Sequence, residues 1–100
     1  MNEDVINRIC IRITIRIDEK EVGHGTGTLV KGKDNFYVLT AHHCIYGDNN
    51  KYPDIQIHQI ILQRQCAFNA PFEDVELLEI TESDFEEDWV VLKVKFEDKD

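Results

Sequence analysis

The sequence has no long hydrophobic run, few cysteines and few basic residues. No apolar stretch approaches the ~20 residues that a membrane span needs, and charges interrupt the N-terminal segment where a signal peptide would have an apolar core. The 3 cysteines cannot all pair within one chain, which fits a reducing compartment better than a disulfide framework. We therefore expect a cytoplasmic protein that has no membrane partner.

Basic residues are outnumbered, and the imbalance lies in one part of the chain. There are 20 aspartates and glutamates against 11 lysines and arginines, and residues 71–100 supply the whole net charge of −9. This sign disfavours a nucleic-acid partner. The acidic run from Glu73 to Glu87 is either solvated surface or a docking face for a basic partner.

The sequence does contain a succession of strand patterns. Its 100 residues suffice for one small domain, 1–100. From Ile9 to Ile17, isoleucine alternates with other residues, the period-two pattern of a strand with one buried face. Further strands are predicted near 23–30, 36–41, 55–63, 75–80 and 89–96, separated by turn residues. This pattern predicts an all-β fold, a six-stranded antiparallel β-barrel.

Two of these strands carry the residues of chemical interest. In the segment Phe36–Cys44, an apolar strand is followed by two histidines and a cysteine. Asp88 directly precedes another apolar strand, which begins at Trp89. A histidine that acts as a general base needs a rigid, partly exposed position and a carboxylate that holds its other nitrogen. A strand end followed by a tight turn offers such a position.

These motifs resemble those of the trypsin-like peptidases, which have the chymotrypsin fold. Thr40-Ala41-His42-His43-Cys44 is similar to the family's Thr-Ala-Ala-His-Cys motif, and Asp88-Trp89-Val90-Val91-Leu92 to the motif that carries its orienting acid. With the glycine-rich segment 25–30, the resemblance covers about residues 9–96. It implies the N-terminal half of a chymotrypsin-like double barrel, with His43 and Asp88 as the catalytic pair.

Neighbouring residues compete for these roles. Counting back from the cysteine selects His43, and His42 is expected to be an ordinary surface or core-edge histidine. Asp88 is selected because it opens an apolar strand, although three other acids crowd it, Asp84, Glu86 and Glu87. The alternative for His43 is an ordinary hydrogen-bonded histidine, and the alternative for Asp88 is a solvated loop acid. Adjacent histidines on extended backbone would point to opposite faces, so we expect no metal and no cofactor.

The resemblance also bears on the cysteines. In secreted relatives the cysteine after the catalytic histidine is bridged to one just before the glycine-rich strand. Gly25 stands where that partner would be, which implies a free, small, buried thiol at Cys44. Cys10 and Cys66 lie in separate segments, so we expect both of these thiols to be free as well.

The nucleophile that should complete a catalytic triad is missing. Ser83, the single serine, lies in an acidic run without glycine neighbours, so it has neither the tight turn nor the N–H donors of an oxyanion hole. The resemblance therefore implies the N-terminal half of an intracellular serine endopeptidase that acts on proteins or peptides and is inactive alone.

Either the missing C-terminal barrel or a partner chain would supply the nucleophile, which is a serine or a cysteine. Two other hypotheses remain open. The chain is either a non-catalytic interaction module with an acidic face or part of a split protease completed by another chain. An exposed barrel interface would also make a homo-oligomer possible.

Overall fold

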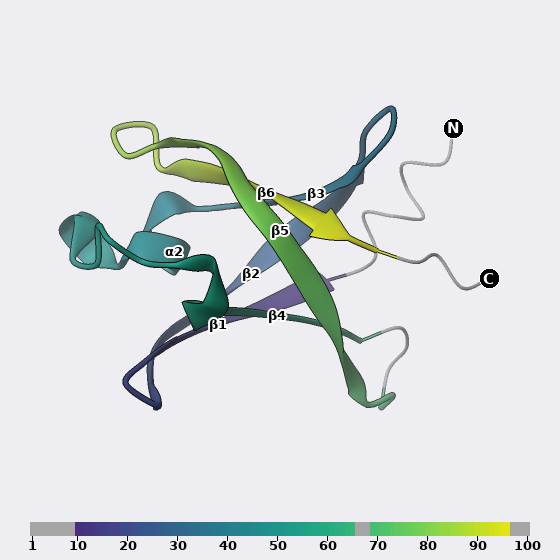
Figure 1. The fold of residues 1–100 in the computed structure, drawn as a ribbon, viewed down its shortest axis with the longest axis horizontal. Coiled ribbons are helices and arrows are strands. Elements are labelled where there is room, and N and C mark those ends of the chain that lie inside the picture. The colour runs from purple at the N-terminus through teal and green to yellow at the C-terminus, as the bar shows by residue number, and fades with distance from the viewer. Residues whose placement is uncertain (1–9, 66–68, 97–100) are drawn as a thin grey trace.

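Six antiparallel strands close into a barrel in the order β1-β2-β3-β6-β5-β4 (Figure 1). The computed structural model describes residues 10–65 and 69–96. The strands are β1 (Cys10–Ile17), β2 (Lys20–Lys31), β3 (Phe36–Thr40), β4 (Ile60–Gln65), β5 (Phe72–Asp84) and β6 (Trp89–Lys95). The prediction of an all-β, six-stranded antiparallel barrel is thus confirmed.

Alternating apolar side chains fill the interior of the barrel. In β1, Ile11, Ile13 and Ile15 are buried, while Arg12 and Arg16 between and beyond them are exposed. Inward positions of the other five strands add to the core: Leu29, Val38, Leu62, Val75, Val90, Leu92 and Val94. Burying each such side chain contributes about 1.5–3 kcal/mol, so this interior holds the surrounding site residues on a rigid frame.

Strands β4 and β5 differ most from the prediction. Strand β4 begins at Ile60 instead of residue 55, because Ile57–Gln59 forms a 3-10 turn that Gln56 and Gln59 cap reciprocally. Strand β5 begins earlier and ends later than predicted, and two register shifts let it follow β6 around the barrel wall. Both differences arise from local hydrogen bonding and twist, which the apolar pattern does not report.

A short helix follows β3. Helix α2 spans His42–Tyr46, so His42 and His43 lie on helical backbone, and the prediction of extended backbone at these two residues is wrong. Within residues 10–65 and 69–96, no helix is long and apolar enough to cross a membrane.

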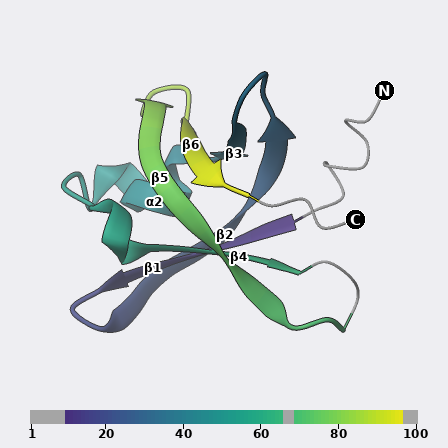
Figure 2. The ribbon, with the colours of Figure 1, turned by 45° about the vertical axis from the view of Figure 1, so that its right-hand side comes forward.

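The pairing of β3 with β6 decides which segments meet. Thr40 lies opposite Val90, so the end of β3 is next to the beginning of β6. In the two ribbon views, α2 and the β5–β6 turn lie at the same end of the barrel (Figures 1 and 2). The antiparallel register therefore places the residues after Thr40 beside those before Trp89.

Candidate active site

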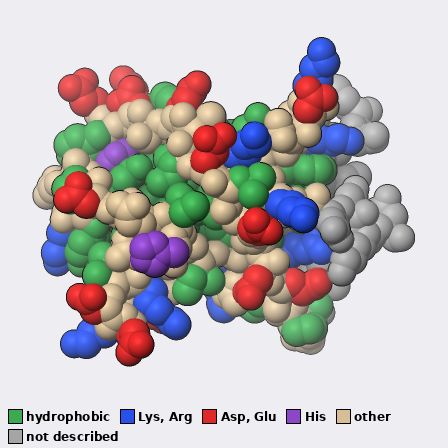
Figure 3. Space-filling model, in the orientation of Figure 1, with side chains coloured by type: hydrophobic (Ala, Val, Ile, Leu, Met, Phe, Trp, Pro, Cys, Tyr) green, Lys and Arg blue, Asp and Glu red, His purple; other side chains and the backbone are tan. Residues whose placement is uncertain are grey.

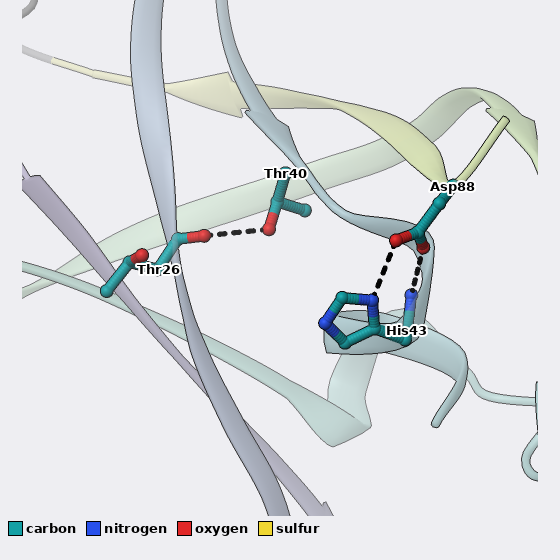
Figure 4. Close-up of polar contacts among 4 residues, drawn as sticks. All are labelled: Thr26, Thr40, His43 and Asp88. Atoms are coloured by element: carbon teal, nitrogen blue, oxygen red, sulfur yellow. Dashed lines mark hydrogen bonds and ion pairs between the residues drawn. The ribbon is translucent and has the colours of Figure 1, made fainter. Parts of the chain in front are cut away.

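The two predicted site residues, His43 and Asp88, are in direct contact. They are 45 residues apart in the sequence, yet Nδ1 of His43 lies 2.8 Å from Oδ2 of Asp88. The other carboxylate oxygen, Oδ1, accepts a hydrogen bond of 3.0 Å from the backbone N–H of His43 (Figure 4). One carboxylate thus holds both the ring and the backbone of one histidine, which restricts the ring's orientation.

This contact determines the tautomer of the neutral imidazole. An ionised carboxylate only accepts hydrogen bonds, so Nδ1 of His43 carries the proton and Nε2 of the neutral ring keeps a lone pair. Nε2 points away from Asp88 (Figure 4). The side chains of His43 and Asp88 are 50% and 48% exposed. The pair therefore presents an oriented, accessible base.

The environment of Asp88 favours its ionised form. The hydrogen bond from the His43 backbone N–H, and then the one from its ring, lower the pKa of Asp88 below the ordinary value of 3.8. Desolvation opposes this effect but is weaker. Asp88 is therefore a carboxylate at neutral pH, as the orientation of a histidine base requires.

The lowered pKa of Asp88 predicts a pH-dependent contribution to stability. Because the pKa is lower in the folded chain than in the unfolded one, ionised Asp88 stabilises the fold above about pH 4, and this stabilisation is lost as the pH falls through the folded-state pKa. We expect the difference in urea midpoint between the wild type and Asp88→Asn to be present at about pH 5 and to shrink as the pH falls below about 4.

Glu86→Gln is the matched control for this experiment, because it removes one charge from the same turn and Glu86 has no side-chain hydrogen bond within the described residues. It should leave the urea midpoint close to the wild-type value over the same pH range. A difference between wild type and Asp88→Asn that does not change in acid would contradict the expectation.

Asp88 has an unusual backbone conformation. Its φ of 59° lies in the left-handed region, which costs a non-glycine residue on the order of 1 kcal/mol. Two hydrogen bonds within the turn support this conformation: Asp88 donates from its N–H to the Phe85 carbonyl at 3.3 Å, and Glu87 donates from its N–H to Oδ1 of Asp84 at 3.0 Å. The turn thus fixes the position of Asp88 directly before β6.

The end of β3 is fixed by a threonine. The Thr40 hydroxyl donates a hydrogen bond of 2.8 Å to the carbonyl of Thr26 in β2 (Figure 4). Thr26 lies beyond the paired residues of β2 and β3, which end at Thr28 and Leu39. This bond continues the attachment between the strands up to the point where α2 begins, and so limits movement of His43 relative to the barrel.

A cleft of about 240 Å³ opens beside His43. Its walls come from β1, β2, α2 and the segment that follows α2, and they include Val22, His24, His43, Cys44, Asp48 and Tyr52. The wall is therefore partly apolar and partly polar. Sequence reasoning did not find this cleft, because its residues come from segments with no shared motif.

The other histidines and the single serine are not part of the hydrogen-bonded pair, although His24 lines the cleft beside it. His24 and His58 are exposed, and Ser83 is an exposed residue of β5 opposite Val90. His42 is only 5% exposed, which agrees with the core-edge alternative and not with the surface one. Among residues 10–65 and 69–96, no three histidine, cysteine or acidic side chains are grouped so as to hold a metal ion.

Cys44 packs against β2. A Cβ atom at Gly25 would lie 2.5 Å from Sγ of Cys44, so the glycine leaves the space that this sulfur atom occupies. Cys44 is free and partly buried, a less complete burial than expected, and Cys10 is free and exposed. The prediction for Cys66 concerns a residue outside the described ranges. The contact accounts for a glycine at position 25.

Comparison of the chain with family models, with curated proteins and with solved structures finds no match. The closed barrel and the histidine–carboxylate pair at its end are therefore the observations on which a function has to be argued.

Proposed function

We propose that this chain is the N-terminal half of an intracellular trypsin-like endopeptidase, in which His43 is the general base and Asp88 orients it. The observation that carries the proposal is the double hydrogen bond from His43 to Asp88, through Nδ1 at 2.8 Å and the backbone N–H at 3.0 Å. A solvated loop acid that happened to lie near a histidine would not be expected to accept a hydrogen bond from the histidine's backbone N–H as well as from its ring. The partly exposed Nε2 is where a base must receive a proton.

In the proposed reaction, Nε2 of His43 takes the proton from a serine or cysteine nucleophile as this attacks the peptide carbonyl. The imidazolium then gives that proton to the leaving amine, and Asp88 stabilises the positive charge while it exists. The lowered pKa of Asp88 supports this role, because the carboxylate stays ionised throughout. The cleft beside His43 offers room for part of a peptide substrate.

The nucleophile and the oxyanion hole are proposed to come from outside the barrel, on a C-terminal barrel or on a partner chain. Exposed apolar side chains next to the site support a covering partner, since Phe85 begins the turn that carries Asp88 and Trp89 follows that turn. Acidic side chains gather over the same turn (Figure 3). A second copy of the chain is another candidate for covering these apolar side chains.

An intracellular location is part of the proposal. It rests on Cys44, which is unpaired and whose family partner position is Gly25, and on the free thiol of Cys10. Free thiols of this kind are typical of reducing compartments.

Covalent labelling tests the function directly. The polypeptide that contains this barrel is to be isolated from its native source, together with any tightly bound chain, and treated with a fluorophosphonate probe for serine and an epoxide probe for cysteine nucleophiles. We expect one of the probes to label this polypeptide or its bound chain. His43→Ala should slow the labelling by about 10⁴-fold or more, and Asp88→Asn by a similar factor, because a nucleophile without its oriented base is weak.

His58→Ala and Glu86→Gln are the matched controls, because they remove an exposed histidine and an exposed acid that form no hydrogen bond or ion pair with His43 or Asp88. Both variants should be labelled at the wild-type rate. Labelling that persists in His43→Ala, or no labelling of any associated polypeptide, would contradict the proposed function.

A further inference from the structure

His42, the residue before the proposed base, has a burial that the proposed reaction does not explain. It is the first residue of α2, and its side chain is 5% exposed. Its Nδ1 is buried without a hydrogen-bond partner in the part of the chain that the structure describes. Burying a polar nitrogen without a partner is costly, so the ring must be held in this position by its other contacts.

Those contacts are aromatic and join two elements. The His42 ring stacks on Tyr46, one turn further along α2, with centroids 4.3 Å apart and planes at 24°. It also meets Phe85, with centroids 5.2 Å apart and planes at 44°. Tilted and offset ring pairs at these distances contribute about 0.5–1.5 kcal/mol beyond burial. Phe85 is 52% exposed even with this contact, and His42 is the aromatic ring that it meets within the described residues.

Phe85 in turn supports the proposed catalytic acid. Its carbonyl accepts the hydrogen bond from the N–H of Asp88, whose φ of 59° is unfavourable for a residue with a side chain. Two adjacent residues of α2 therefore hold two points of one turn: His42 contacts Phe85, and His43 contacts Asp88. A strained conformation persists only where the surrounding structure determines it in this redundant way.

We propose that His42 is a positioning residue, which acts through Phe85 to hold the Phe85–Asp88 turn in the conformation that places Asp88 on His43. The importance of His42 for catalysis rests on the proposed function, whereas its effect on the position of Asp88 is independent of that function. Without the ring contact, Phe85 is free to leave the barrel surface, and Asp88 is expected to relax from its left-handed conformation and lose its hold on Nδ1 of His43.

Proximity to Asp88 offers a second way for His42 to act, and the variants must separate the two. A charge on His42 contributes to lowering the pKa of Asp88, although this is the weakest of the causes. His42→Phe keeps an aromatic ring that can stack on Tyr46 and Phe85 but removes the titratable nitrogen. His42→Ala and Phe85→Ala remove one ring each, and Phe85→Ala changes a largely exposed side chain, so it is expected to fold.

Two NMR readouts on the 100-residue chain report the position of Asp88 without any need for peptidase activity. They are the titration of the Asp88 carboxyl carbon and the low-field proton resonance of the Nδ1–H of His43. In His42→Ala and Phe85→Ala, we expect the Asp88 titration midpoint to rise towards its ordinary value and the low-field resonance to disappear. His42→Phe should keep both signals close to those of the wild type.

Phe72→Ala is the matched control, because it removes an exposed phenylalanine at the opposite end of β5. It should change neither signal. The proposal is overturned if folded His42→Ala and Phe85→Ala keep the wild-type titration and resonance, or if His42→Phe loses both as His42→Ala does. Because no reaction is measured, a failure here is distinct from a failure of the labelling experiment that tests the proposed function.

Discussion

The purified 100-residue chain is expected to hydrolyse no peptide faster than the buffer does. It holds an oriented base in the His43–Asp88 pair, but Ser83 lies in an acidic strand and lacks the glycine neighbours that would let backbone N–H groups form an oxyanion hole. Loss of the nucleophile in triad enzymes costs on the order of 10⁶ in rate. A broad library of quenched fluorescent peptides, followed for hours at micromolar protein, is the suitable measurement.

Variants distinguish this result from contamination by another protease. Turnover that survives in His43→Ala belongs to a contaminant and leaves the expectation in place. Turnover that is present in the wild type and in His58→Ala but absent in His43→Ala would refute it, because the chain would then contain its own nucleophile. In that case Ser83→Ala identifies whether the single serine is responsible.

Substitution of Gly25 is expected to change stability strongly, and in opposite directions for two side chains. A Cβ at this position would lie 2.5 Å from Sγ and 3.0 Å from Cβ of Cys44, too close for any unlinked side chain. Gly25→Ala should therefore destabilise the barrel by about 1–3 kcal/mol, the usual cost of overpacking. Chemical denaturation under reducing conditions measures this loss.

Gly25→Cys should behave differently when it is oxidised. Cβ atoms joined by a disulfide are usually about 3.5–4.5 Å apart, so a separation of 3.0 Å requires the two segments to move apart by several tenths of an ångström. A bridge between positions 25 and 44 closes a loop of roughly 20 residues, for which chain entropy predicts about 3 kcal/mol of stabilisation less the strain. We expect a mass lower by two hydrogen atoms and a higher urea midpoint, both reversed by reductant.

Gly23 provides the control on the same strand. A Cβ at Gly23 would meet its nearest atoms at 3.9 Å, an ordinary contact, so Gly23→Ala should cost much less than Gly25→Ala. Gly23→Cys should form no bridge to Cys44. Equal effects of alanine at the two positions would show that the packing of Cys44 on Gly25 is not as described. So would a Gly25→Cys chain that keeps all its thiols free after treatment with an oxidant.

Much of the fold could be predicted because its signal is local. The alternation of isoleucine in Cys10–Ile17 and the apolar strand Trp89–Lys95 are patterns of adjacent residues, and their period of two belongs to a half-buried strand whatever the rest of the chain does. The ends of elements were less predictable. The turn at Ile57–Gln59 and the helix at His42–Tyr46 form where short-range hydrogen bonds compete with the extended backbone that the apolar residues suggest.

His42 shows a different kind of limit. Tyr46 follows it by four residues, and this spacing becomes a contact only because the segment is helical instead of extended as predicted. Its second partner, Phe85, lies in the acidic run that was expected to be either solvated surface or a docking face. A buried histidine without a polar partner was therefore not predictable from either segment by itself.

The sequence by itself determined where the titratable side chains lie in the chain and which side chains alternate into the core, since both depend on residue type and on neighbours in the chain. Only the tertiary structure decided that His43 and Asp88 meet, because the pairing of Thr40 with Val90 is one of several registers that two apolar strands can adopt. It likewise decided that Cys44 lies on Gly25 and His42 against Phe85. These contacts join segments far apart in the chain. They form because the barrel closes around a single packed core, which selects one strand register from the several that are possible.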